Sequence, residues 1–140
     1  MSNQDLNTKQ LIDRILCILS FKHKLIGCGY MREALKIFSD SYDVRVLLCK
    51  DVYPVIAAKQ SKTSTSVERA IRNAISDCYY YGNLKFVNVL LNSNVVNDKY
   101  PPTNGELIAE LSAFLYRVNN GEEDISEIMH KLKNPPKDND

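Results

Sequence analysis

Residues 53–75 read YPVIAAKQSKTSTSVERAIRNAI, and they predict two helices separated by a tight polar break. Pro54 fits the first turn of a helix, where its missing N–H has no partner to lose, so a short helix is expected over residues 52–60. Polar residues 61–63 follow directly and form the break. Two helices joined by so short a turn must pack against each other, and the rest of the fold is built around this pair.

The second helix of this stretch has a marked start, a marked end and one apolar face. Thr65 and Glu68 have the spacing of a capping box, which predicts that the helix starts at Thr65. Gly82 and Asn83 are expected to end it. Apolar side chains at i, i+3 and i+4 spacing form the face that is predicted to be buried: Val67, Ala70, Ile71, Ala74, Ile75 and Cys78.

The two helices together have the pattern of a helix-turn-helix. Such a motif needs a small residue where the second helix crosses the first, and an apolar residue that closes the pair. Ala57 and Val67, ten positions apart, fit these two roles. Ile56, Ala70 and Ile71 are expected to fill the junction. The start of the second helix would then point outward, where a DNA major groove could meet it.

Apolar periodicity predicts further helices on both sides of this pair. Gly27 and Gly29 are expected to separate the first two helices, and Thr103 with Glu106 forms a second candidate capping box. The predicted segments are 8–21, 30–40, 44–48, 84–91 and 103–118, followed by one frayed stretch over 125–132. The sequence thus predicts an all-α fold, a compact bundle of about six helices with an embedded helix-turn-helix.

The composition is that of one ordinary globular domain. The chain has 140 residues, of which 44% are hydrophobic and 25% charged, and these values exclude disordered, collagen-like and membrane-spanning classes. The amino terminus lacks the basic start and apolar run of a secretory signal, so a cytoplasmic location is expected. Residues 1–120 carry a net charge of +4 and residues 121–140 one of −3, which predicts a helical domain followed by an acidic, mobile tail.

Catalytic, metal and cofactor sites have weak support in the sequence. His23 and Cys28 are the one nearby pair of base and nucleophile, and His23 is more simply a solvated residue in a basic turn. No glycine-rich phosphate loop is present. The two histidines, His23 and His130, are 107 positions apart, which excludes a closely spaced zinc site. The four cysteines are expected to be free and buried: Cys17, Cys28, Cys49 and Cys78.

The outer face of the second helix carries residue types that bind DNA. Arg69 and Arg72 are three positions apart and project from one side, where a guanidinium can donate two hydrogen bonds to guanine O6 and N7. Lys59 and Lys62 flank them and are candidates for phosphate contacts. The alternative is a solvated face on which Glu68 and Arg72 form only a surface ion pair, worth ~0.3 kcal/mol.

Four blocks of the chain point to a family. They are GYMREAL at 29–35, YPVIAAK at 53–59, VERAIRNAI at 67–75 and PTNGELIA at 102–109. In this order and at this spacing they resemble the C-terminal DNA-binding domain of the sporulation-initiation response regulator of endospore-forming Firmicutes. The similarity extends over about residues 10–118, and VERAIR is its most specific part.

The resemblance implies an all-helical domain that binds a promoter box with a TGTCGAA-like core, often as tandem head-to-tail protomers. It carries base or groove contacts onto Glu68, Arg69 and Arg72. The chain has Ser66 where the family has arginine and Asn73 where it has histidine, so weaker binding or a related DNA sequence is expected. The DNA-binding residues predicted from spacing and resemblance together are Lys59, Lys62, Ser64, Thr65, Ser66, Glu68, Arg69, Arg72 and Asn73.

Two functions remain open on the sequence. The residues before the match are too few for the receiver domain of the family's regulator, so a stand-alone transcription regulator with double-stranded DNA as its partner is expected. The alternative is a non-enzymatic interaction protein that pairs with, or antagonises, the full-length sporulation regulator. A mobility shift on a TGTCGAA duplex separates the two.

Overall fold

A computed structural model describes residues 3–41, 46–124, 127, 130 and 133 of the chain. Within these residues the protein is helical and has no strand, which confirms the all-α prediction. The α-helices and the π-helical turn assigned within the described residues are, in chain order, α1 (Asn3–Ile18), α2 (Ile26–Asp40), η1 (Leu48–Val52), α3 (Tyr53–Gln60), α4 (Ser64–Tyr81), α5 (Phe86–Leu91) and α6 (Asn104–Asn119).

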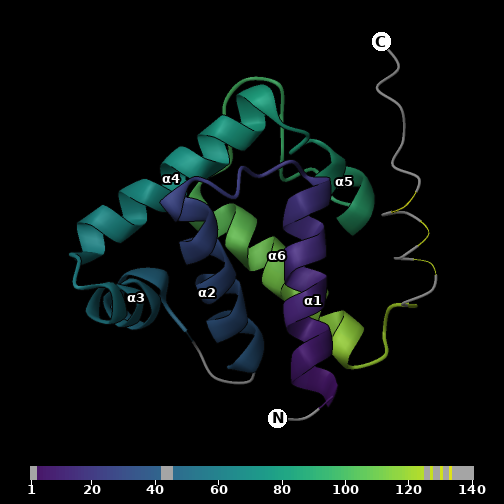
Figure 1. Ribbon diagram of the computed structural model, residues 1–140. Coiled ribbons are helices and arrows are strands. Elements are labelled where there is room, and N and C mark those ends of the chain that lie inside the picture. Colours follow the sequence, from purple (N-terminus) through teal and green to yellow (C-terminus); the bar gives the residue numbers. More distant parts are fainter. Residues whose placement is uncertain (1–2, 42–45, 125–126, 128–129, 131–132, 134–140) are drawn as a thin grey trace.

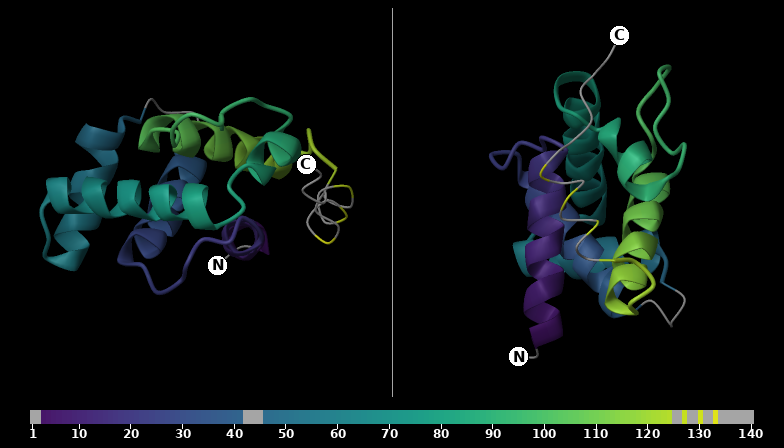
Figure 2. Two further views of the ribbon diagram at one scale, coloured as in Figure 1. Left: turned by 90° about the horizontal axis from the view of Figure 1, so that it is seen from above. Right: turned by 90° about the vertical axis from the view of Figure 1, so that its right-hand side faces the viewer.

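Helix α2 lies at the centre of the fold and packs against α1, α3, α4 and α6. Figure 1 shows α4 lying across one end of α2, with α3 beside the first turns of α4 and α5 beyond its last turn. The views in Figure 2 show α1 and α6 on opposite sides of α2. The largest fully buried side chains come from every α-helix except the short α5 and from two positions between helices: Ile15, Leu16, Leu19, Met31, Leu35, Ile56, Ile71, Ile75, Leu84, Leu107, Ile108 and Phe114.

The glycines expected to separate the first two helices lie inside α2, so that prediction is wrong. Gly27 faces α4 so closely that a Cβ atom there would lie 1.9 Å from the carbonyl oxygen of Ala70. Gly29 has open space instead, with no atom within 4 Å of an added Cβ. Gly27 is therefore a packing residue, because only a residue without a side chain lets the two helix backbones approach this closely.

Helix α1 ends three residues before the end of the predicted segment 8–21. Ser20 takes a left-handed conformation with φ 65°, and the N–H of Phe21 donates to the carbonyl of Leu16 at 3.0 Å. This is a Schellman motif, in which the residue after the left-handed one packs back on the helix. Phe21 is buried, and its apolar side chain extended the periodic pattern beyond the true end at Ile18.

The helix predicted over 44–48 is wrong at residues 46 and 47; residues 44–45 lie outside the described residues, and Leu48 is the first residue of the π-turn η1. Val46 and Leu47 are not helical, and Leu47 is extended, with φ −112° and ψ 129°. The carboxylate of Asp51 accepts the backbone N–H of Leu47 at 2.9 Å. This local hydrogen bond lies at the start of the π-turn η1, which continues directly into α3.

The start of α6 and its buried face follow the sequence prediction. Thr103 Oγ1 accepts the N–H of Glu106 at 3.1 Å, and Glu106 Oε1 accepts the N–H of Thr103 at 3.0 Å. This reciprocal pair is the expected capping box. The apolar stripe expected on this helix is buried throughout: Leu107, Ile108, Leu111, Phe114, Leu115 and Val118.

The cysteines divide into two pairs, and all four are free. Cys28 and Cys78 are buried, as predicted, whereas Cys17 and Cys49 are exposed, so the prediction of four buried thiols is half wrong. Cys17 lies on the outer face of α1 although its neighbour Leu16 is fully buried. The stretch predicted as a frayed helix over 125–132 lies mostly outside the described residues.

Candidate nucleic-acid interface

Helix α4 begins one residue earlier than predicted and has a different cap. Thr63 is extended, with φ −94° and ψ 156°, and its Oγ1 accepts the N–H of Ser66 at 3.1 Å. Thr65 lies inside the first turn, so the capping box predicted for Thr65 and Glu68 is wrong. Thr63 takes the cap because an extended residue just outside the helix can aim its hydroxyl at the free amides of the first turn.

The turn between α3 and α4 is built by a left-handed serine. Ser61 has φ 53° and ψ 46°, and the N–H of Lys62 donates to the carbonyl of Ala57 at 2.9 Å. Ala57 and Val67 are both buried at the crossing, as the helix-turn-helix pattern predicted. Ile56 and Ile71 fill the junction and are fully buried, and Ala70 is half-buried.

The nine residues predicted to bind DNA lie at the end of α3, in the turn and in the first turns of α4, and Figure 1 shows these elements next to each other. We call these nine residues the α4 surface. Ser64 and Glu68 are half-buried. The other seven are exposed: Lys59, Lys62, Thr65, Ser66, Arg69, Arg72 and Asn73. Since the opposite side of α4 is buried against α2, α3 and α6, the α4 surface is the side of this helix that another molecule can reach.

The two arginines of the α4 surface differ in their partners. Arg69 is exposed and forms no hydrogen bond or ion pair with any residue that the structure describes. Arg72 Nη1 donates to Glu68 Oε1 at 2.9 Å, and 57% of the Arg72 side chain remains exposed. A pair of this kind on a solvated helix face is worth ~0.3 kcal/mol, so it orients the guanidinium but is readily exchanged for another acceptor.

The lysines of the surface are weakly held. Lys59 Nζ lies 3.9 Å from Glu33 Oε1 of α2, with 63% of its side chain exposed. Lys62 is exposed in the turn. A long exposed lysine with at most a loose ion pair can reach a phosphate without breaking a buried contact.

Two residues that the sequence analysis did not assign to the site, Gly27 and Asn104, contact the backbone of α4 on its buried side. Gly27 allows α2 to approach the backbone of Ala70, and Asn104 at the start of α6 donates to the carbonyl of Glu68 at 3.1 Å. Both belong to contacts between residues far apart in sequence, so no local spacing could indicate them. The signals that were present are the glycine within an apolar pattern and the asparagine in the block PTNGELIA.

The weak catalytic candidate is not supported by the geometry. Cys28 is fully buried, and burial raises the pKa of its thiol, which disfavours the thiolate that a nucleophile needs. Arg32 Nη2 lies 2.6 Å from His23 Nδ1; because a guanidinium can only donate, Nδ1 accepts this bond. Among the described residues, no group of three His, Cys, Asp or Glu side chains could hold a metal ion.

A protein-family model matches most of the chain. The family model described as "Sporulation initiation factor Spo0A C terminal" matches residues 12–115, a range that contains α3, α4 and the whole α4 surface. The chain belongs to this family. The Spo0A C-terminal family consists of DNA-binding effector domains that act in transcription regulation and sporulation. It is a regulator family and not an enzyme family.

The family assignment agrees with the resemblance read from the four sequence blocks. Because this domain belongs to the Spo0A C-terminal family, its partner is double-stranded DNA. No helix in the described part of the chain is both long and apolar enough to span a bilayer.

Proposed function

We propose that this chain is a sequence-specific transcription regulator whose helix α4 enters the DNA major groove and reads a TGTCGAA-like box. The observation that carries the proposal is the placement of Arg69 and Arg72, which are exposed three positions apart on a helix whose other side is fully buried at Ile71 and Ile75. A helix held in this way can dock as a rigid element in a groove.

The residues of the α4 surface divide into base-reading and phosphate-binding groups. Arg69 and Arg72 suit guanine, since each guanidinium can donate two hydrogen bonds to O6 and N7. Asn73 suits adenine, whose N6 and N7 match the donor and acceptor of an amide. Lys59 and Lys62 suit phosphates on either side. The amides of Ser64 and Thr65, with the hydroxyls of residues 64–66, suit a phosphate at the helix N-terminus.

Glu68 has two roles in this scheme. It orients Arg72 in the free protein through the 2.9 Å hydrogen bond, and it can accept a hydrogen bond from cytosine N4 once α4 is in the groove. Because the ion pair is exposed and weak, exchanging it for contacts with a guanine and a cytosine costs little.

The test is the affinity of the chain for a TGTCGAA duplex and for a scrambled duplex of the same length, measured by fluorescence anisotropy at fixed salt. We expect the specific duplex to bind more tightly, and Arg69→Ala and Arg72→Ala each to weaken that binding by about tenfold or more. Arg14→Ala is the matched control, because Arg14 is an exposed arginine on α1 outside the α4 surface; it should bind as the unchanged chain does.

Equal binding to both duplexes, or variants that bind like the control, would contradict the proposal. A different preferred duplex recovered by selection from random sequences would keep the mechanism and replace the TGTCGAA box. If the chain alone gave no shift but changed the footprint of the full-length sporulation regulator, the interaction function would replace DNA reading.

A further inference from the structure

Asn104 is a buried polar residue that joins three helices. It is the first residue of α6 and is only 8% exposed. Its Nδ2 donates to the hydroxyl oxygen of Tyr53 at 3.0 Å and to the backbone carbonyl of Glu68 at 3.1 Å. Tyr53 is the first residue of α3, and Glu68 lies near the start of α4. One side-chain amide thus connects the N-terminal end of α6 to both helices of the helix-turn-helix.

The donor role of this amide is fixed by its partners. A backbone carbonyl can only accept, so the atom facing Glu68 must be the NH₂ nitrogen. Burial raises the pKa of the Tyr53 phenol, which keeps it a neutral hydroxyl that can accept the second bond. The Oδ1 atom of Asn104 is buried without a hydrogen-bond partner, a cost that a small apolar residue would avoid.

The contact acts on the backbone of a residue whose side chain belongs to the α4 surface. Asn104 holds the carbonyl of Glu68, while the carboxylate of the same residue orients Arg72 at 2.9 Å. Two positions further along, the carbonyl of Ala70 lies against Gly27 of α2. The start of α4 is therefore held by α6 through a hydrogen bond and by α2 through close packing.

We propose that Asn104 is a positioning residue: its amide fixes the first turns of α4 relative to α3 and α6, and so determines how well the α4 surface distinguishes one DNA sequence from another. The inference rests on the proposed function. It adds to that function a role for Asn104, a buried residue that need not touch DNA itself. Base recognition requires side chains held close to one geometry, whereas phosphate binding tolerates small displacements.

The test uses two variants that remove or shorten the donating side chain. Asn104→Asp keeps the shape but replaces NH₂ with an oxygen that cannot donate to Glu68, and Asn104→Ser provides a neutral side chain too short to bridge both partners. Tyr53→Phe removes one acceptor and leaves the Glu68 bond in place. Affinities for the specific and scrambled duplexes, and amide hydrogen exchange of the free protein, are measured for each.

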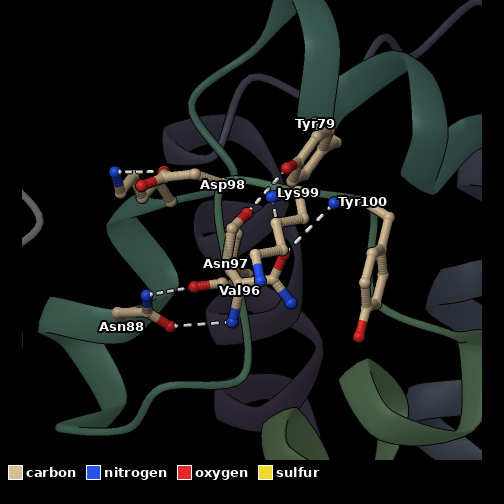
Figure 3. A network of polar contacts seen from close by, with 8 residues as sticks. Tyr79, Asn88, Val96, Asn97, Asp98, Lys99 and Tyr100 are labelled. Carbon is tan, nitrogen blue, oxygen red and sulfur yellow. Dashed lines mark hydrogen bonds and ion pairs between the residues drawn. The ribbon is translucent and has the colours of Figure 1, made fainter.

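Asn88 provides the matched control, and Figure 3 shows its two hydrogen bonds to Val96. Its Nδ2 donates to the carbonyl of Val96 at 2.7 Å and its Oδ1 accepts the N–H of Val96 at 3.0 Å. This part-buried amide ties the loop after α5, near the last turn of α4 and away from the α4 surface. Asn88→Asp removes a similar donor and should leave DNA discrimination unchanged.

For the Asn104 variants we expect the specific affinity to fall about tenfold, scrambled-duplex affinity to change by less than about twofold, and amides of residues 64–72 to exchange faster while α1 and the middle of α6 keep their protection. Tyr53→Phe should have a smaller effect in the same direction. Unchanged discrimination and unchanged exchange in both Asn104 variants would overturn the inference, as would loss of protection throughout the chain.

The failure of the proposed function would look different. If the unchanged chain bound both duplexes equally, the DNA-reading proposal would fail. The exchange of residues 64–72 would still decide whether Asn104 positions α4, because it is measured on the free protein.

Discussion

Gly27 and Gly29 occupy the same helix in opposite surroundings. A Cβ at Gly27 would lie 1.9 Å from a backbone oxygen of α4, whereas one at Gly29 would meet no atom within 4 Å. Replacing glycine with alanine inside a helix normally stabilises it by about 1 kcal/mol. At Gly27 the added methyl group must push two backbones apart, and overpacking of this kind costs about 1–3 kcal/mol.

We therefore expect Gly27→Ala to lower the free energy of unfolding by about 1–3 kcal/mol and Gly29→Ala to raise it by up to about 1 kcal/mol. Urea denaturation followed by circular dichroism measures both. Gly27→Ala should also weaken specific DNA binding, because it displaces the start of α4. Equal effects of the two substitutions would show that α2 and α4 do not approach as closely as described.

At the scale of the helices, the capping box of α6 makes stability depend on pH. A hydrogen bond from the Thr103 backbone lowers the pKa of the Glu106 carboxyl below its ordinary value of 4.5, and the Thr103 side chain adds to this. The folded state thus favours the ionised carboxylate. The contribution of the Glu106 carboxylate to the free energy of unfolding is fully present above the ordinary pKa. It is lost as the pH falls through the lower pKa of the folded state.

We expect the unchanged chain to lose more stability between about pH 5 and pH 3 than Glu106→Gln does, since a glutamine side chain can still accept the Thr103 N–H but does not titrate. The difference should be small because Glu106 is exposed. Thermal unfolding at several pH values measures it. If the stability of the two proteins changed equally with pH, the ionised carboxylate of Glu106 would not stabilise the cap.

Helix interiors followed from the sequence, and several helix ends did not. Apolar spacing is local, so it correctly predicted the buried faces of α4 and α6. The end of α1 depends on left-handed Ser20, and serine is not the residue that usually marks such a position. The start of α4 was misplaced for a related reason: Thr63 and Thr65 both fit a cap, and backbone geometry selects Thr63.

At the scale of the whole molecule, the missed features are contacts between distant parts of the chain. The exposed residues of the α4 surface could be predicted, because one helix and one turn place them together. Asn104 and Glu68 are 36 positions apart, and Gly27 meets Ala70 only once α2 crosses α4. Their roles depend on how the helices pack, which neither periodicity nor composition specifies.

The packing of the whole chain also divides its four cysteines by reactivity. Reaction with a disulfide reagent requires an accessible thiolate. Burial raises the pKa of the Cys28 thiol, and burial raises that of Cys78 to about 12; Cys78 Sγ also donates to the carbonyl of Leu19 at 2.9 Å. Cys17 and Cys49 are exposed.

We expect two thiols to react quickly in the folded protein and four in denaturant, as measured by absorbance of the released aromatic thiol at pH 8. Cys17→Ser should reduce the number of fast-reacting thiols to one, whereas Cys28→Ser should leave that number at two. Binding of the specific duplex should not slow the two fast thiols, because neither lies on the α4 surface. Rapid reaction of all four in the folded chain would mean that the core around α1, α2 and α4 opens far more readily than its packing implies.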